Sequence, residues 1–555
     1  MRELHGIGVG RGIASGPVLR MPDPIPEPST APRQKDAGEE RSAVAVALAA
    51  VAADLTARAE RAGGSAKDVL DAQAMMAQDP GLVDDVNARI ESGSTGERAV
   101  FEAFAAFQEL LSGMGGYLAE RAADLADVAQ RIVAHLRGVP APGVPTADYP
   151  FVLVAHDLAP ADTALLDLDK VVALVTRDGG PTSHTAILAR AKSITAIVGV
   201  AGADDLADGT IVIVDAAVGT VTPSPSAAQL AAVEARTAEL EAVRAAPITD
   251  GALADGEKIP LLANLGSPKD AAEAVGLGAE GVGLFRTEFL FLGATTAPTI
   301  AQQRADYTAV LEAFPGRKVV VRCLDAGADK PLAFLNSAVE ENPALGLRGL
   351  RALRANEPIL RDQLTALALA QEATSAELWV MAPMVSDVEE TEYFTSLARE
   401  LGIRVAGVMA EVPSLALMAD QVAAASDFVS IGTNDLTQYT MAADRMLGTV
   451  ADYQNPWHPA VLRLIKLIGD AGRAAGKPVG VCGEAAADPL LAVVLVGLGA
   501  TSLSMTPAAL ADVRAELLKH TRADAEKLAA AALAAPTAAA AHAAASSAFS
   551  TPAST

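Results

Sequence analysis

The sequence predicts a multidomain α/β protein, in which an α/β domain with an inserted all-helical domain is followed by a (β/α)8 TIM barrel. Three observations predict this fold class. The chain has 555 residues, which is enough for about three or four domains. A helical block separates two stretches of β-type sequence near the start. From about Lys258, eight apolar strands alternate with helix-length segments over about 270 residues, a usual length for such a barrel.

The α/β domain is expected over residues 1–30 and 141–225. Its first part, HGIGVGRGIASGPVLR, is typical of a strand pair broken by glycines. Residues 31–140 are expected to form the inserted helical domain, because Ala, Leu, Val and Met recur there every three and four positions. Short β-type runs then resume with FVLVAHDL, VVALVT, AIVGV and TIVIVDAAVGTVTP.

Residues 226–250 are expected to form a linker helix, residues 251–530 the barrel, and residues 531–555 a low-complexity tail that is disordered or frayed. The barrel strands are predicted in IPLLANLG, GVGLFRTEF, KVVVRCLD, ELWVMAPM, RVAGVMAEV, FVSIGTNDL, PVGVCGE and TSLSM. The uncharged stretch Pro489 to Ala511 is long enough to span a bilayer, but it contains Gly, Ser and Pro. We interpret it as a buried helix followed by a buried strand.

Composition restricts the partners and the compartment. The formal net charge of −25 argues against nucleic acid or an anionic membrane surface as the main partner, and it suits a basic docking partner. The two cysteines, Cys323 and Cys482, are far apart and lack metal-ligand spacing. We therefore expect a reducing, cytoplasmic location, with Cys323 packed on its strand.

Polar residues recur where the predicted barrel strands end, which is where barrels of this kind gather their chemistry. Arginines with a lysine suit a phosphate group, because guanidinium groups bind phosphate oxygens two at a time. Two carboxylates with a neighbouring amide suit Mg²⁺. Any one of these charges is also explained by a structural ion pair. Together they predict a site for a phosphorylated small acid with Mg²⁺.

His184 lies in DGGPTSHTAILARA, between a glycine turn and the start of a predicted helix. A helix N-terminus favours anions and disfavours a protonated ring, so a neutral imidazole there could act as a nucleophile and carry a phosphoryl group. The alternative is a histidine that caps or packs. Spacing alone leaves both interpretations open.

Five motifs together resemble Enzyme I of the bacterial sugar phosphotransferase system, the phosphoenolpyruvate–protein phosphotransferase. They are GGPTSHTAILARA, LFRTEFLF, ENPALGLR, SIGTNDLTQYTMAADR and VCGE. The resemblance runs from the first residues to about residue 530. Single motifs are shared with pyruvate phosphate dikinase and phosphoenolpyruvate synthase, but those enzymes carry a large ATP-binding domain ahead of the histidine domain.

The resemblance implies that the α/β domain swivels and that its His184 takes the phosphoryl group of phosphoenolpyruvate and passes it to the phosphocarrier protein HPr. It implies a Mg²⁺ cofactor, a homodimer formed through the barrel, and no nucleic-acid or membrane partner. Cys482 would protonate the enolate as pyruvate forms. The remaining implied roles are phosphoenolpyruvate binding by Arg286, Arg322, Lys330, Arg348, Asn434 and Arg445, Mg²⁺ binding by Glu411 and Asp435, orientation of the histidine by Thr163, and docking of HPr by Asp68, Asp71 and Met75.

Three departures from the family pattern leave every reacting group in place. They are Pro181 in the histidine motif, Ala326 and Ala328 in DAGADK, and EVPS in place of the commoner ETPA. Two other functions stay open at this stage. One is a dikinase-like enzyme that takes phosphate from ATP, although the sequence has no Walker-type loop. The other is a non-catalytic sensor of phosphoenolpyruvate or HPr, which would have no use for a proton donor.

Overall fold

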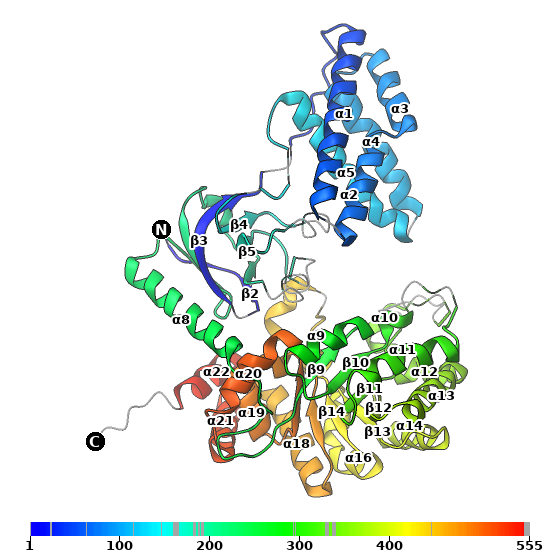
Figure 1. Cartoon of the computed structure of the whole chain (residues 1–555), viewed down its shortest axis with the longest axis vertical. Helices are drawn as coiled ribbons and strands as arrows, with labels where there is room; N and C mark the ends of the chain where they lie inside the picture. The colour runs from blue at the N-terminus through cyan, green and yellow to red at the C-terminus, as the bar shows by residue number, and fades with distance from the viewer. Residues whose placement is uncertain are drawn as a thin grey trace. The chain divides into compact units, whose positions relative to one another are not determined.

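The structure is a computed structural model of the chain (Figure 1). It describes residues 2–10, 12–22, 25–62, 64–114, 116–141, 143–145, 147–158, 162, 166–180, 185–186, 189, 194–291, 294, 296–327, 332, 334–335, 340–445 and 447–548. The chain divides into two compact units, Met1–Ala238 and Glu239–Thr555, and helix α8 (Ala227–Ala245) crosses the division. The predicted fold class is confirmed in both units.

The first unit contains an eight-stranded mixed sheet in the order β1-β8-β7-β3-β4-β5-β6-β2. Its strands are β1 Leu4–His5, β2 Ile7–Val9, β3 Ile13–Arg20, β4 Phe151–Ala155, β5 Val171–Thr176, β6 Ala196–Val198, β7 Ile211–Asp215 and β8 Thr220–Pro223. The predicted pairing of the first two glycine-flanked strands is wrong. β2 pairs with β6 at one edge, whereas β3 lies between β4 and β7, because the chain turns through Gly10 with φ of 78° and separates them.

The helical insertion forms a bundle with its own core (Figure 1). Its helices are α1 Ala37–Ala62, α2 Gly64–Met76, α3 Pro80–Glu91, α4 Gly96–Met114 and α5 Gly116–Arg137. Apolar residues at helical spacing bury one stripe of each helix, as with Val44, Leu48 and Leu55 on α1. The bundle is therefore held mainly by aliphatic packing.

One described helix, α1 over Ala37–Glu60, is long and apolar enough to cross a membrane by length and composition alone. Several of its apolar residues, including Val44, Val51 and Leu55, belong to the bundle core, and 39% of the apolar window is buried inside the protein. Core helices of water-soluble domains pass the same test, so this is weak evidence for a membrane span.

The second unit is a closed parallel barrel in the order β9-β10-β11-β12-β13-β14-β15-β16, as predicted. Its strands are β9 Leu261–Leu265, β10 Val282–Arg286, β11 Lys318–Arg322, β12 Glu377–Ala382, β13 Ala406–Ala410, β14 Val429–Ile431, β15 Val479–Val481 and β16 Ser502–Met505. The surrounding helices are α9 Ala271–Gly276, α10 Glu288–Phe291, α11 Ile300–Glu312, α12 Leu350–Ala355, α13 Glu357–Ala373, α14 Val388–Glu400, α15 Pro413–Leu417, α16 Ala419–Ala425, α17 Thr433–Met441, α18 Pro459–Ala475, α19 Pro489–Gly497 and α20 Leu510–Leu517.

Local sequence signals set the helix ends of the barrel. Thr299 and Gln302 form a reciprocal capping box at the start of α11. Pro459 opens α18 and Gly476 ends it in the left-handed conformation with φ of 62°. The uncharged stretch from Pro489 forms the predicted buried helix α19 and buried strand β16.

The expectation of a disordered or frayed tail is wrong for most of that segment. Helices α21 (Arg522–Ala534) and α22 (Ala538–Ser547) continue the chain, and the side chains of Ala541 and Ala545 are buried in the barrel unit's core. The His542 ring meets the Trp457 ring edge-on, with centroids 5.0 Å apart. Alanine has the highest helix propensity, so an Ala-rich run becomes an ordered helix where tertiary packing gives it a partner.

Removal of the Asp488 carboxylate should destabilise this part of the barrel. Asp488 Oδ1 accepts from the Leu491 backbone at 2.9 Å as the cap of α19, and its Oδ2 accepts from Trp457 Nε1 at 3.0 Å. We expect Asp488→Ala to lower the free energy of unfolding by about 2 kcal/mol, measured by denaturant titration. Asp470→Ala removes only an exposed ion pair with Lys466, so this control should change stability by less than about 0.5 kcal/mol. Equal effects of the two substitutions would contradict the prediction.

Candidate active site

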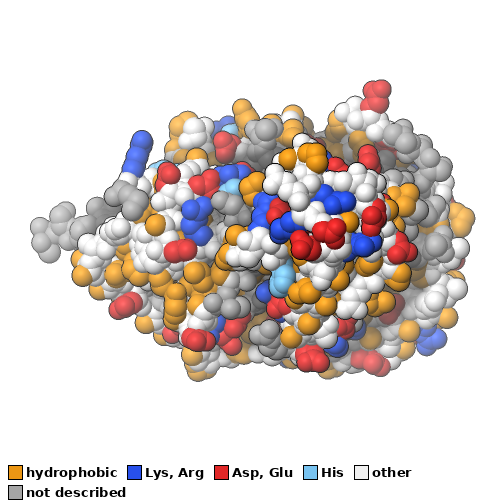
Figure 2. Space-filling model, turned by 90° about the horizontal axis from the view of Figure 1, so that it is seen from above, with side chains coloured by type: hydrophobic (Ala, Val, Ile, Leu, Met, Phe, Trp, Pro, Cys, Tyr) orange, Lys and Arg blue, Asp and Glu red, His pale blue; other side chains and the backbone are white. Residues whose placement is uncertain are grey.

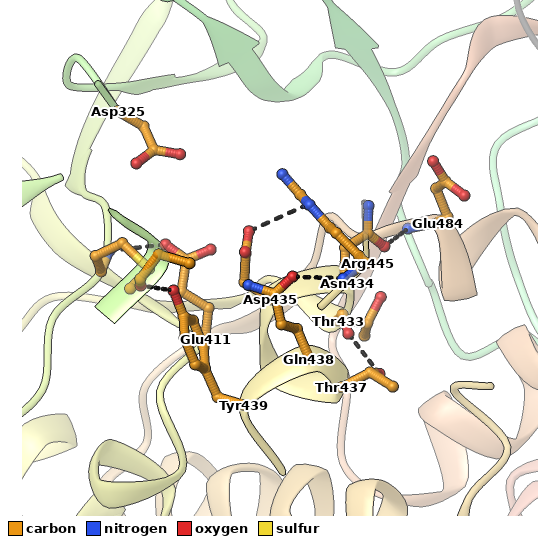
Figure 3. A network of polar contacts seen from close by, with 12 residues as sticks. Asp325, Glu411, Thr433, Asn434, Asp435, Thr437, Gln438, Tyr439, Arg445 and Glu484 are labelled. Carbon is orange, nitrogen blue, oxygen red and sulfur yellow. Dashed lines mark hydrogen bonds and ion pairs between the residues drawn. The ribbon is translucent and has the colours of Figure 1, made fainter. Parts of the chain in front are cut away.

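Predicted site residues meet at one end of the barrel because all eight strands run parallel. Arg286 and Arg322 are the last residues of β10 and β11. Glu411 follows β13, Asn434 and Asp435 lie in the first turn of α17, and Cys482 follows β15. Figure 3 shows the carboxylates of Asp325, Glu411 and Asp435 around one space.

A chain of buried ion pairs links three loops at this end. Asp325 Oδ2 lies 3.2 Å from Arg322 Nη1 and 3.2 Å from Arg348 Nη2, and its side chain is fully buried. Arg348 Nη1 lies 3.2 Å from Asp435 Oδ1, while Arg445 Nη1 lies 3.4 Å from Asp435 Oδ2. The network thus fixes the orientation of Asp435 from both sides.

Arg348 is 2% exposed, and its guanidinium contacts the carboxylates of Asp325 and Asp435 and the Tyr439 hydroxyl. Its contacts in this structure are therefore those of a residue that positions other side chains. Tyr439 in turn donates a hydrogen bond to the Ala344 carbonyl, which ties the loop before Arg348 to α17.

Two arginines at the strand ends differ in how they are neutralised. Arg322 pairs with Glu288 and Asp325; burial lowers the pKa of its guanidinium, but these carboxylates outweigh burial and hold the pKa above its usual value. Burial and the neighbouring Arg322 charge lower the pKa of Arg286. An anion bound between Arg286 and Arg322 would relieve this repulsion.

Glu411 carries the clearest sign of an absent partner. Its Oε1 accepts from the Met384 backbone at 2.7 Å, whereas its buried Oε2 has no hydrogen-bond partner among the described residues. Burial, and then the charges of Asp435 and Asp325, raise the pKa of Glu411 to about 7. A buried carboxylate oxygen left in this state suits a bound cation, which would favour the ionised form.

These residues fit a divalent metal with few protein ligands. Within the described parts of the chain, no group of three or more His, Cys, Asp or Glu side chains is placed to hold a metal ion. Mg²⁺ commonly takes one or two carboxylates and completes its shell with water and substrate oxygens. Glu411 and Asp435 supply two such carboxylates on adjacent strand ends.

Cys482 lies at the floor of the site and is 1% exposed. Burial raises the pKa of its thiol to about 11, although the Ser430 hydroxyl, which donates to Sγ at 3.2 Å, lowers it in part. Asn264 Nδ2 donates to the Cys482 carbonyl at 3.0 Å and holds the backbone there. The thiol is therefore protonated at neutral pH and can donate a proton. Cys323 is fully buried in the barrel core, as its predicted packing role requires.

Several residues that support this site have no role in the prediction from the sequence, although Glu288 and Asp325 are among the polar residues at the predicted strand ends. Gln363 accepts from the Leu324 backbone at 3.0 Å and donates to Thr287 Oγ1 at 3.2 Å, so it joins the ends of β10 and β11 from outside the barrel. Glu288, Asp325, Ser430 and Tyr439 likewise contact predicted residues. Asp325 and Glu288 follow predicted strand ends, and that position is a sequence signal for a site residue. Gln363 lies inside a helix, where no such signal marks it.

The histidine site and one side of the anion site lie outside the described residues. This applies to His184, Thr163, Lys330, Pro181 and Ala328. Beside them, Thr185 is described and buried, and its Oγ1 donates to Asp157 at 2.8 Å. Ala326 is 2% exposed at the end of the barrel.

The predicted docking residues lie on α2. The backbone of Asp68 is helical, but its side chain lies outside the described part. Asp71 Oδ2 pairs with Lys67 Nζ at 2.9 Å, and Met75, four residues further on, is 75% exposed. Asn434, predicted at the substrate, accepts from the Glu484 backbone at 3.1 Å (Figure 3).

Comparison with known proteins defines the class. Residues 240–522, about half of the chain, match the family model of the PEP-utilising enzyme, PEP-binding domain. Residues 5–121 match the N-terminal model of PEP-utilising enzymes and residues 148–219 the mobile-domain model. The barrel is thus the PEP-binding domain of a PEP-utilising enzyme.

Three relatives carry the name phosphoenolpyruvate-protein phosphotransferase. The Streptomyces coelicolor protein is 55% identical over 96% of both chains. The Haloferax volcanii protein is 43% identical over 85% of both chains, and the Geobacillus stearothermophilus protein 38% identical over 95% of both. The chain belongs to the phosphoenolpyruvate-protein phosphotransferase family.

The raised pKa of Glu411 predicts a pH-dependent stability in metal-free protein. Between about pH 4.5 and 7 the unfolded glutamate ionises while the buried one keeps its proton, so the folded state loses stability as pH rises. Glu411→Gln should remove this loss, making the variant more stable than the parent by about 3 kcal/mol near pH 8 and nearly equal to it at pH 4.

Denaturant titration with a chelator present checks this. Added Mg²⁺ should stabilise the parent and not the variant. A difference between parent and variant that does not change with pH would contradict the prediction.

Proposed function

We propose that this end of the barrel binds phosphoenolpyruvate with Mg²⁺ and that His184 receives its phosphoryl group. The observation that carries the proposal is the grouping of arginines, an unpartnered buried carboxylate oxygen and a buried protonated thiol at the same strand ends. A phosphorylated enol acid needs all three: charge for its phosphate, a cation, and a proton for its carbon.

The chain transfers the phosphoryl group of phosphoenolpyruvate to a protein histidine and releases pyruvate, the first step of sugar uptake by the phosphotransferase system. In our proposal the acceptors are His184 and then a histidine of HPr. Transfer passes through a transition state with charge spread over the phosphoryl oxygens, so positioning and electrostatic stabilisation carry most of the catalysis.

Arg286, Arg322 and Arg445 would bind the phosphate, with Lys330 and Asn434 assisting. The lowered pKa of Arg286 supports this role, because a nearby anion would stabilise its charged form. Arg348 would act by holding Asp325 and Asp435, since its guanidinium contacts them directly. Thr163 would orient the second ring nitrogen of His184.

Mg²⁺ would be held by Glu411 and Asp435, and when bound it neutralises phosphate charge during transfer. The unpartnered Oε2 of Glu411 and the clamped carboxylate of Asp435 support this assignment. Cys482 would complete the reaction: its S–H bond breaks, a C–H bond forms at the terminal carbon of the enolate, and a thiolate remains.

The partner HPr would dock on the helical bundle near Asp68, Asp71 and Met75. Met75 supports this with an exposed side chain, and the pairing of Asp71 with Lys67 shows a carboxylate at the surface beside it. On the face seen in Figure 2, acidic and basic side chains are interspersed with apolar ones. A homodimer through the barrel and a cytoplasmic location complete the proposal.

Incubation of the protein with ³²P-labelled phosphoenolpyruvate and Mg²⁺ tests the acceptor. We expect acid-labile label on the wild-type protein and none on His184→Ala, because an imidazole phosphate hydrolyses readily in acid whereas the phosphate esters of Ser, Thr and Tyr do not. His135→Ala, on the helical bundle, is the matched control and should keep the label. Label on His184→Ala would disprove the assignment, and labelling by ATP in place of phosphoenolpyruvate would support a dikinase instead.

Substitution of Cys482 tests the proton donor. We expect Cys482→Ala to slow pyruvate formation by about 100-fold or more, the usual contribution of a positioned acid, while phosphoenolpyruvate binding measured by calorimetry stays near that of the wild type. Cys323→Ala is the thiol control. A variant that forms pyruvate at the wild-type rate would exclude Cys482 as the donor.

A further inference from the structure

The interior of the barrel below Cys482 combines polar groups with apolar side chains. Barrels of this fold are usually filled by bulky branched side chains, but here the lining includes Gly283, Ser430, Gly480, Ser502 and Ser504. Together with Lys318 and apolar residues that include Leu262, Val320, Trp379 and Phe428, they enclose a cavity of about 20 Å³ that Cys482 also lines. Such a space holds about one water molecule, and the serine hydroxyls give that water hydrogen-bond partners.

Polar groups lead in steps from Cys482 toward the opposite end of the barrel. Ser430 Oγ donates to Cys482 Sγ at 3.2 Å. A Cβ at Gly480 would lie 3.9 Å from Ser430 Oγ and 3.1 Å from Ser502 Oγ, so the missing side chain leaves a gap between the two hydroxyls. Lys318 Nζ then donates to Ser502 Oγ at 3.4 Å.

Lys318 connects this interior to the amino-terminal mouth of the barrel. It begins β11, and it lines both the small cavity and a second, open cavity of about 680 Å³. Its ammonium lies 4.7 Å from the centre of the Trp379 ring. The charged groups of the open cavity are Glu280, Arg317, Arg473 and Lys477, and Glu377 is the strand neighbour of Lys318.

Lys318 is suited to proton exchange near neutral pH. Burial lowers the pKa of its ammonium to about 8, and the Glu377 charge opposes this only in part. A lysine in this state gives up and regains a proton readily, unlike an exposed one.

We propose that Lys318, Ser502 and Ser430 form a proton relay that reprotonates Cys482 from the amino-terminal mouth of the barrel. The proposal rests on the proposed role of Cys482 as proton donor. In that role each turnover would leave a buried thiolate at Cys482, which must regain a proton before the next turnover. Substrate and metal would occupy the other side of the site, so the proton would come through the barrel interior.

The relay moves one proton per turnover. Ser430 gives its hydroxyl proton to the Cys482 thiolate and takes one from the bridging water. The water takes one from Ser502, and Ser502 takes one from the Lys318 ammonium. The resulting amine recovers a proton from solvent in the open cavity, so the net change is one solvent proton transferred to sulfur.

Carbon exchange and deuterium uptake, followed in one reaction, distinguish loss of the proton relay from loss of the phosphoryl-transfer reaction. The full-length protein is incubated in D₂O with Mg²⁺, phosphoenolpyruvate and ¹⁴C-pyruvate. Carbon label passing between pyruvate and phosphoenolpyruvate reports the reversible reaction, which can return the same proton to the thiolate. Deuterium entering the pyruvate methyl group requires Cys482 to exchange with solvent.

We expect Lys318→Met and Gly480→Ala each to lower deuterium entry per carbon exchange by about tenfold or more, with carbon exchange near the wild-type rate. Gly480→Ala leaves every relay side chain in place and fills the gap between the hydroxyls, so it decides the question if Lys318→Met does not fold. Lys477→Met, at the same open cavity, is the control and should keep the wild-type ratio.

An unchanged ratio in both Lys318→Met and Gly480→Ala would overturn the relay, as would an equal loss in Lys477→Met. Wild-type protein that exchanges carbon but takes up no deuterium would also overturn it. Absence of carbon exchange in the wild type would instead overturn the proposed function, so the two failures are distinguishable.

Discussion

The pairing of buried Asp325 with Arg322 and Arg348 is the interaction on which the site depends. A buried charge costs free energy unless an opposite charge pairs with it. In this network each carboxylate and each guanidinium group offsets the burial cost of the group with which it pairs. Through Arg348 the chain of pairs reaches Asp435, and through Arg322 it reaches Glu288. Loops that are far apart in sequence are thereby held in one geometry before any substrate arrives.

The same network explains why Glu411 differs from the other carboxylates. Asp325 and Asp435 have guanidinium partners, whereas Glu411 has a backbone amide on one oxygen and nothing described on the other. Its carboxylate is therefore the place where added positive charge is most favourable. A fifth guanidinium group paired with Glu411 would make the metal-free protein more stable, but it would weaken metal binding.

Polar groups also extend down the barrel interior, between apolar side chains. Charged groups occupy the carboxyl ends of the strands, small hydroxyl and glycine residues line the interior below Cys482, and a partly buried lysine closes the other end. Most of the apolar packing lies between strands and helices, where Phe285, Tyr307 and Leu364 are fully buried, and a smaller apolar cluster that includes Val320 and Phe428 also contains Cys482.

Periodicity, strand-end polarity and motif order determined the fold class, the barrel strands and the ends at which Arg322, Glu411 and Cys482 would lie, because these depend on local spacing. Only the tertiary structure decided that β2 and β3 separate, that the Ala-rich segment packs as α22, and that Gln363 and Ser430 support the site. Such features depend on which distant side chains come into contact, and a local pattern contains no information on that.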